Sequence, residues 1–128
     1  MSGTRTLKDK SVLIVEDNVY LALDLCAAIQ DLEGRPVGPV YTVADALAAM
    51  DSEHLAAAIV DCELPGGDVI SLIEALTKKG VPFVLQGASE AVPEISEVRA
   101  VPVLVKPIRP HDVASILVNE VSKTPPNP

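Results

Sequence analysis

The chain has 128 residues, of which 48% are hydrophobic and 22% are charged, a composition typical of one folded domain and not of a disordered chain. Its 18 acidic and 10 basic residues give a formal net charge of −8. This charge repels phosphate backbones and anionic lipid, so it argues against nucleic acids and membrane surfaces as partners and favours cations or basic protein surfaces.

The first part of the chain alternates between two patterns of apolar residues, one typical of a buried strand and one typical of a helix. Residues 12–15 are a short, β-branched apolar run, which is typical of a strand buried on both faces. Apolar residues then recur at helical spacing over residues 21–32, and Gly34 supplies a stop for this helix. Residues 37–41 predict a second strand, which is weaker because glycine and proline interrupt it.

A second helix and a third strand follow. Thr42 is a candidate N-cap with Asp45 three residues later, and the helix it begins carries Met50. Residues 56–60 are an apolar run that leads directly into Asp61. The sequence therefore predicts a buried strand that ends on a carboxylate.

The middle of the chain repeats this alternation. Residues 65–67 (PGG) predict a loop, and apolar residues at helical spacing predict a third helix over residues 69–76. Pro82 opens a fourth strand over residues 83–86, where a proline at the first position removes no ladder hydrogen bond.

The last third is less regular. Residues 88–101 allow only a short helix, because Pro93 is tolerated only in a first turn. Residues 102–105 predict a fifth strand, and Pro110 begins a last helix. The tail, residues 123–128, has no apolar content, and we expect it to be disordered.

Five strands alternating with five helices predict a parallel sheet with helices on both faces, and such folds bind ligands at the carboxyl ends of the strands. Glu16 and Asp17 follow the first predicted strand, and Asp61 follows the third. Gly87 follows the fourth, and Lys106 follows the fifth. We therefore expect three carboxylates and one ammonium group to lie at one edge of the sheet.

This combination of charges favours a particular chemistry. Carboxylates packed together repel one another unless a cation joins them, and Mg²⁺ suits one or two carboxylates together with waters and a phosphate oxygen. Lys106 adds a second positive charge for an anionic ligand. The arrangement predicts a site that handles a phosphoryl group, with a carboxylate as a possible nucleophile.

The core must be largely aliphatic, because the chain has only two tyrosines, one phenylalanine and no tryptophan. The two cysteines, Cys26 and Cys62, are too few for a disulfide scaffold and have no zinc-site spacing, so free thiols in a reducing compartment are expected. No apolar run reaches about 18 residues, and the run behind the basic N-terminal residues is too short for a signal peptide. A cytoplasmic location is therefore expected. The residues expected in the core are Leu25, Ile29, Val60, Ile73, Val84, Val105 and Ile116.

Three stretches resemble the receiver (response-regulator) domain of two-component signalling. They are residues 12–18 (VLIVEDN), residues 59–67 (IVDCELPGG) and residues 105–107 (VKP), in the order and spacing of that family. The resemblance covers about residues 10–121. It implies an α/β fold of the flavodoxin-like doubly wound type, a five-stranded parallel sheet of order 2-1-3-4-5 with helices on both faces.

The resemblance also implies a domain organisation. Residues 1–9 would be an N-terminal extension, residues 10–122 the receiver domain, and residues 123–128 the tail. The chain is similar to short receivers in which the segment before the last strand is abbreviated, and we expect it to act as a stand-alone receiver without an output domain.

The resemblance assigns roles to individual residues. Asp61 would be the phosphoacceptor that takes a phosphoryl group from a histidine kinase or phosphotransfer protein. Asp17 would bind Mg²⁺, Glu16 would bind it directly or through water, and the backbone carbonyl of Glu63 would be a further ligand. Lys106 would pair with the phosphoryl oxygens, and the X–Pro peptide bond that follows it would be cis.

Two departures from the family pattern stand out. The family carries Thr or Ser at the position of Gly87, where the hydroxyl binds the phosphoryl group, and glycine cannot make that bond. The family also carries an aromatic residue near Val103 or Leu104, and this aromatic rotates inward on activation. Ser89 lies nearby, but at the wrong offset. We therefore expect intact phosphorylation chemistry and an altered readout.

The preferred function is a phosphorylated receiver that signals by binding another protein, whose identity is unknown. The alternative is a receiver-fold binding module that works without phosphorylation. A third possibility, an aspartate-nucleophile phosphatase, depends on Glu63 as acid–base two residues after Asp61, and we favour a protein that is not an enzyme. Cys62 is expected to pack away from the site, and His111 to be a solvated capping residue.

Overall fold

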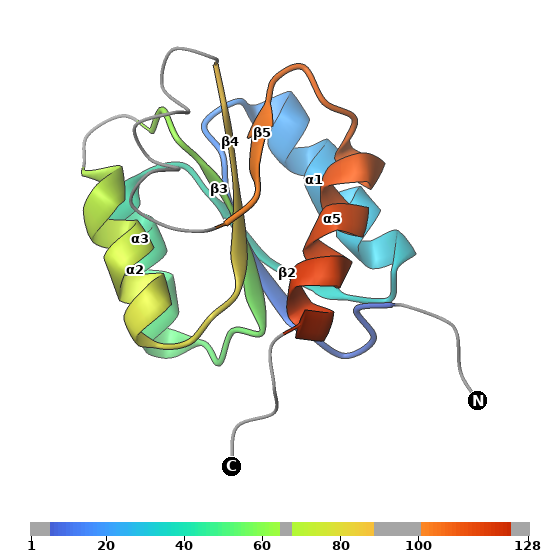
Figure 1. The fold of residues 1–128 in the computed structure, drawn as a ribbon. Coiled ribbons are helices and arrows are strands. Elements are labelled where there is room, and N and C mark those ends of the chain that lie inside the picture. Colours follow the sequence, from blue (N-terminus) through green and yellow to red (C-terminus); the bar gives the residue numbers. More distant parts are fainter. Residues whose placement is uncertain (1–5, 65–67, 89–100, 124–128) are drawn as a thin grey trace.

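The computed structural model describes residues 6–64, 68–88 and 101–123. A five-stranded sheet lies between two layers of helices (Figure 1). The strands are β1 (Ser11–Val15), β2 (Arg35–Val40), β3 (Ala57–Asp61), β4 (Phe83–Gly87) and β5 (Val103–Val105). The described helices are α1 (Val19–Asp31), α2 (Val43–Ser52), α3 (Val69–Lys78) and α5 (Pro110–Lys123).

All strand pairs are parallel, and the strand order is β2-β1-β3-β4-β5. This confirms the predicted α/β fold class and strand order. The predicted loop at residues 65–67, the predicted short helix within residues 89–100 and the tail after residue 123 lie outside the described residues.

Polar side chains begin three of the helices where the sequence changes period. Asn18 accepts a hydrogen bond from the Leu21 amide, and Thr42 accepts one from the Asp45 amide, which confirms the predicted N-cap. Asp68 caps α3 in the same way. Each cap satisfies a backbone donor that the first turn of a helix otherwise leaves unpaired.

Gly34 does not end α1 in the way the sequence predicts. Glu33 takes the left-handed conformation, with φ of 67°, whereas Gly34 has no positive φ. A Cβ at Gly34 would lie 2.8 Å from Cγ2 of Ile29. Glycine is therefore needed here for the close approach of β2 to α1 and not for its backbone freedom.

The second strand is longer and starts earlier than residues 37–41, the predicted range. Among the described strands it pairs only with β1 and therefore forms an edge of the sheet, where prolines are tolerated because their missing N–H groups can face solvent. The pairing shifts register between Leu13 and Val15, beside the cis Gly38–Pro39 bond.

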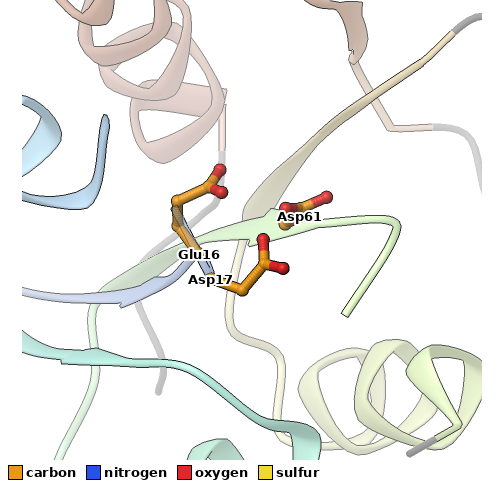
Figure 2. A group of neighbouring side chains, drawn as sticks. All are labelled: Glu16, Asp17 and Asp61. Carbon is orange, nitrogen blue, oxygen red and sulfur yellow. The ribbon is translucent and has the colours of Figure 1, made fainter. Parts of the chain in front are cut away.

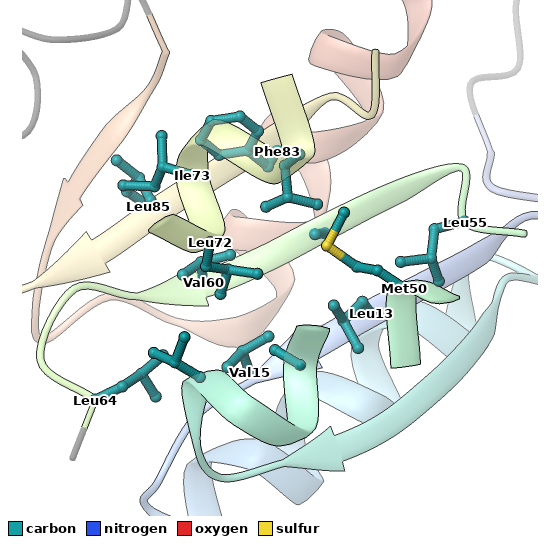
Figure 3. Packing of buried hydrophobic residues seen from close by; sticks show 14 of the residues in the cluster. Leu13, Val15, Met50, Leu55, Val60, Leu64, Leu72, Ile73, Phe83 and Leu85 are labelled. Atoms are coloured by element: carbon teal, nitrogen blue, oxygen red, sulfur yellow. The ribbon is translucent and has the colours of Figure 1, made fainter. Parts of the chain in front are cut away.

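Each face of the sheet has its own apolar layer. The α2/α3 layer contains side chains of β1, β3 and β4 together with α2 and α3, and Figure 3 shows its packing. The α1/α5 layer covers the opposite face with side chains from α1 and α5. Successive side chains of β1, β3 and β4 alternate between the two layers, as expected for strands buried on both faces.

Most of the expected core residues are buried. The fully buried ones are Leu25, Ile29, Val60, Ile73 and Val84. Ile116 packs against the α1/α5 layer and is only partly buried. The prediction for Val105 is wrong: its side chain is 48% exposed, because the three-residue β5 is the other edge of the sheet. Leu7, within the predicted N-terminal extension, is fully buried in the α1/α5 layer.

Candidate functional site

Strand alternation brings four polar side chains to one corner of the sheet. Glu16, Asp61, Gln86 and Lys106 stand at the carboxyl ends of β1, β3, β4 and β5. The side chain two positions before each of them belongs to the α1/α5 layer or packs against it: Ile14, Ile59, Val84 and Leu104. Because side chains two apart point to the same face of a strand, the four polar groups lie on the α1/α5 face of the sheet edge.

Three carboxylates form a cluster there (Figure 2). One carboxylate oxygen each from Glu16, Asp17 and Asp61 lies within 4.8 Å of the others. Glu16 and Asp61 are buried, with 0% and 1% exposure, while Asp17 is exposed. The predicted convergence of these residues is therefore observed, with one carboxylate open to solvent.

Lys106 lies between the two buried carboxylates. Its Nζ is 2.9 Å from Oε1 of Glu16 and 3.3 Å from Oδ2 of Asp61. Its side chain remains 27% exposed, and the Lys106–Pro107 bond is cis, as the sequence resemblance implies. One ammonium group thus balances part of the negative charge at the strand ends.

Backbone amides fix the loop after β3. The Glu63 N–H donates to Oδ1 of Asp61 at 2.8 Å, which brings the main chain of Glu63 beside the carboxylate. The Ala88 N–H donates to Oε1 of Glu63 at 3.2 Å and ties the end of β4 to the same loop. Both oxygens of Asp61 are therefore held, Oδ1 by this amide and Oδ2 by Lys106.

Gln86 is a site residue that sequence reasoning missed. Its Nε2 donates to Oε1 of Glu16 at 2.9 Å, the same oxygen that contacts Lys106. The Asn18 N–H donates to the other oxygen of Glu16 at 3.0 Å. A polar residue at the end of the apolar run 83–86 was the available signal, since a buried amide needs a partner.

Burial and charge act in opposite directions on two pKa values, and both values end above their ordinary range. Burial raises the pKa of Glu16 to about 7, although hydrogen bonds from Asn18 and Lys106 favour its charged form. Burial lowers the pKa of Lys106, but the hydrogen bond to Glu16 and the charges of Asp61 and Glu16 outweigh this effect and leave it above its ordinary value. A further cation beside Glu16 would favour its charged form, as Lys106 already does.

Gly87 lies against Cys62 at the neighbouring strand end. A Cβ at Gly87 would be 3.0 Å from Cβ of Cys62 and 3.6 Å from its Sγ. Cys62 is buried in the α2/α3 layer, which confirms the expected packing role. Burial, together with the charges of Asp61 and Glu63, raises its pKa to about 11, so the thiol stays protonated at neutral pH.

The other positions singled out in the sequence are less central. Val103 packs against the α2/α3 layer and Leu104 against the α1/α5 layer, and both are partly buried. His111 is exposed, with its Nε2 2.8 Å from Oδ2 of Asp31, and thus joins α5 to the end of α1. Ser89 lies outside the described residues.

Within residues 6–64, 68–88 and 101–123, no helix combines the length and hydropathy that crossing a membrane requires.

The likeness of this chain to known proteins lies among solved structures. No protein-family model matches the chain, and no curated protein sequence matches it. Among solved structures, the chain is similar to SdrG from Sphingomonas melonis Fr1, with 34% identity, a TM-score of 0.74, and coverage of 89% of this chain and 97% of SdrG.

Two further structures share the fold. A CheY-like receiver domain from Methanospirillum hungatei JF-1 is 19% identical, with a TM-score of 0.78 over 91% of this chain and 97% of that one. The response regulator PhyR from Brucella abortus is 22% identical, with a TM-score of 0.76 over 93% of this chain and 50% of PhyR. With the strand order and the corner of acids and lysine described above, these likenesses place the chain in the receiver-domain family of response regulators.

Proposed function

We propose that this receiver accepts a phosphoryl group on Asp61 from a histidine kinase or phosphotransfer protein, with Mg²⁺ as cofactor, and signals by binding another protein. One observation carries the proposal: Glu16, Asp17 and Asp61 offer oxygens within 4.8 Å of one another. Lys106 contacts two of these three carboxylates. Metal-binding and phosphoryl-binding charges are thus gathered around one nucleophile.

The donor set fits Mg²⁺. This ion prefers carboxylate and carbonyl oxygens and keeps several waters, so a partly open site suits it. Asp17 is exposed and free to approach an ion, and the adjacent Glu63 main chain can supply a carbonyl oxygen. When bound, Mg²⁺ would neutralise negative charge on the phosphoryl oxygens during transfer.

The transfer itself requires little from the protein beyond position and charge. A carboxylate oxygen of Asp61 forms the new bond to phosphorus, and the bond from phosphorus to the donor breaks, its electron pair leaving with the donor. The Glu63 amide orients the Asp61 carboxylate through Oδ1. Lys106, already 3.3 Å from Oδ2, provides a positive charge for the arriving phosphoryl oxygens.

Phosphorylation at Asp61 is tested with a small donor. Incubation with acetyl phosphate and Mg²⁺ is expected to add the mass of one phosphoryl group to the native chain, measured by intact-mass spectrometry. The Asp61→Asn variant keeps the shape of the side chain but lacks the nucleophilic carboxylate, so it should gain none. An equal mass gain in both proteins would show that another group is modified.

Metal binding is tested separately, without a phosphoryl donor. Mg²⁺ should shift the amide resonances at the ends of β1 and β3, because the three carboxylates lie there. Millimolar concentrations are needed because a site completed largely by water binds the ion weakly. Asp17→Ala should abolish these shifts. Asp24→Ala, which removes an exposed acid of α1 outside the carboxylate cluster, should leave them unchanged. Absence of shifts in the native chain would contradict the proposed metal site.

A second candidate function is a receiver-fold binding module that does not depend on phosphorylation. Gly87 supplies no hydroxyl, and Val103 and Leu104 supply no aromatic ring, so both parts of the usual family switch are missing. This alternative is preferred if the native chain acquires no phosphoryl group in the presence of Mg²⁺.

Catalytic turnover as a phosphatase is not part of the proposal. An acid–base group would have to act from Glu63, two residues after Asp61. Oε1 of Glu63 instead accepts the Ala88 N–H, which gives its carboxylate a role in tying β4 to the loop.

A further inference from the structure

Gln86 is a fully buried amide in a strand whose other buried side chains are apolar. It has 0% exposure and lies opposite Asp61 in the β3–β4 pairing and opposite Leu104 in the β4–β5 pairing. The burial of an amide is unfavourable unless its polar atoms find partners. Its position at the corner of the sheet indicates that the partners belong to the site.

Half of this amide is satisfied and half is not. Nε2 donates to Oε1 of Glu16, and this oxygen is also the one that contacts Lys106. Oε1 of Gln86 is the buried side-chain oxygen or nitrogen for which the described part of the chain offers no hydrogen-bond partner. Buried acceptors left in this state are rare in folded proteins, and a bound water or ligand usually accounts for them.

The shared oxygen of Glu16 matters when Lys106 changes partner. Glu16 has no exposure to solvent, so its carboxylate depends on the donors around it. A phosphoryl group on Asp61 would attract Lys106, which already contacts both carboxylates. Of the side-chain donors to Glu16 in the described residues, Gln86 would then remain.

Resting on the proposed function, we infer that Gln86 is a positioning residue for Mg²⁺. Its NH₂ group holds Glu16 in a fixed orientation whether or not Lys106 stays with that carboxylate. Its free carbonyl oxygen accepts a hydrogen bond from a water that the ion carries, since Mg²⁺ retains several waters when bound to protein. Gln86 thus strengthens Mg²⁺ binding in a site where position 87 lacks the hydroxyl typical of the family.

The test replaces the amide with a side chain of similar length. Gln86→Met removes donor and acceptor together, and groups that orient metal ligands typically change affinity by about 10–100-fold when mutated. Mg²⁺ affinity of the chain alone, from the amide shifts of Asp17 and Asn18, is expected to fall at least about tenfold. Val84→Ala, a buried change two residues earlier on the same face, should lower thermal stability but leave Mg²⁺ affinity within about twofold.

A double-mutant cycle separates positioning from a general structural effect. Because Gln86 acts partly through Glu16 and partly through its own carbonyl oxygen, Gln86→Met should cause a smaller loss of Mg²⁺ affinity in the Glu16→Gln background than in the native background. An equal loss in both backgrounds, or no loss in the native background, overturns the inference. If Gln86→Met does not fold, Gln86→Asn carries the same expectation, because it draws the amide back by one carbon.

The two proposals fail in different ways. A native chain that binds Mg²⁺ and becomes phosphorylated, while Gln86→Met binds the ion equally well, leaves the proposed function intact and removes only the role of Gln86. A native chain that does not bind Mg²⁺ overturns both.

Discussion

Ile29→Ala and Ile73→Ala are each expected to lower the free energy of unfolding by about 2–5 kcal/mol. Both side chains are fully buried, Ile29 in the α1/α5 layer and Ile73 in the α2/α3 layer. With three aromatic residues in the whole chain, the aliphatic side chains fill most of the core. Each truncation therefore removes apolar contacts and leaves a cavity that its neighbours fill only in part.

Urea unfolding of the variants measures these losses, and Val105→Ala is the control. Val105 is a β-branched aliphatic residue like the two isoleucines, but its side chain is 48% exposed, so its truncation should change the free energy of unfolding by less than about 0.5 kcal/mol. Losses below this value for Ile29→Ala or Ile73→Ala would contradict the assignment of the two layers.

Gly87→Thr, which restores the hydroxyl typical of the family, is expected to destabilise the fold. The new Cβ would lie 3.0 Å from Cβ of Cys62, tighter than ordinary van der Waals contact, so Cys62 would have to move. Overpacking of a buried site typically costs about 1–3 kcal/mol. Cys62→Gly removes the opposing atoms, so Gly87→Thr should be less destabilising by at least about 1 kcal/mol in that background. Equal losses in both backgrounds would show that the two residues do not compete for space.

The same position bears on the readout. Without a hydroxyl at Gly87, a phosphoryl group loses one hydrogen bond, worth about 1.5–3 kcal/mol for a charged acceptor. A ligand shifts a conformational equilibrium only by its differential interaction with the two states. Phosphorylation of the native chain is therefore expected to cause only small amide shifts over residues 103–108, and the Cys62→Gly/Gly87→Thr variant should give larger ones. Amide shifts over residues 103–108 as large in the native chain as in the double variant would show that another residue couples the site to this segment. Ser89 would then be tested next.

The fold was predictable because β1, β3 and β5 are short apolar runs that lead directly into charged residues. Val12 to Val15 and Ala57 to Val60 are buried on both faces, and a parallel sheet follows from helices between such strands. Its carboxyl edge then had to collect Glu16, Asp61 and Lys106, since parallel strands all end on the same side.

What the sequence could not provide was contact across strands. The exposure of Val105 depends on β5 being a short edge strand, which an apolar pattern does not reveal. The link from Gln86 to Glu16 joins residues 70 positions apart, and no local pattern predicts it. The space for a side chain at Gly87 likewise depends on Cys62, which directly follows the neighbouring strand β3. Whether a residue with a hydroxyl fits at position 87 therefore depends on both residues.

Borohydride reduction identifies the phosphorylated residue directly, because it converts an aspartyl phosphate to homoserine. After incubation of the native chain with acetyl phosphate and Mg²⁺, peptide mass spectrometry is expected to find homoserine at position 61 and at no other aspartate. Omission of Mg²⁺ should remove the signal. Homoserine at another position, or none at saturating donor and Mg²⁺, would contradict the assignment of Asp61 as the phosphoacceptor.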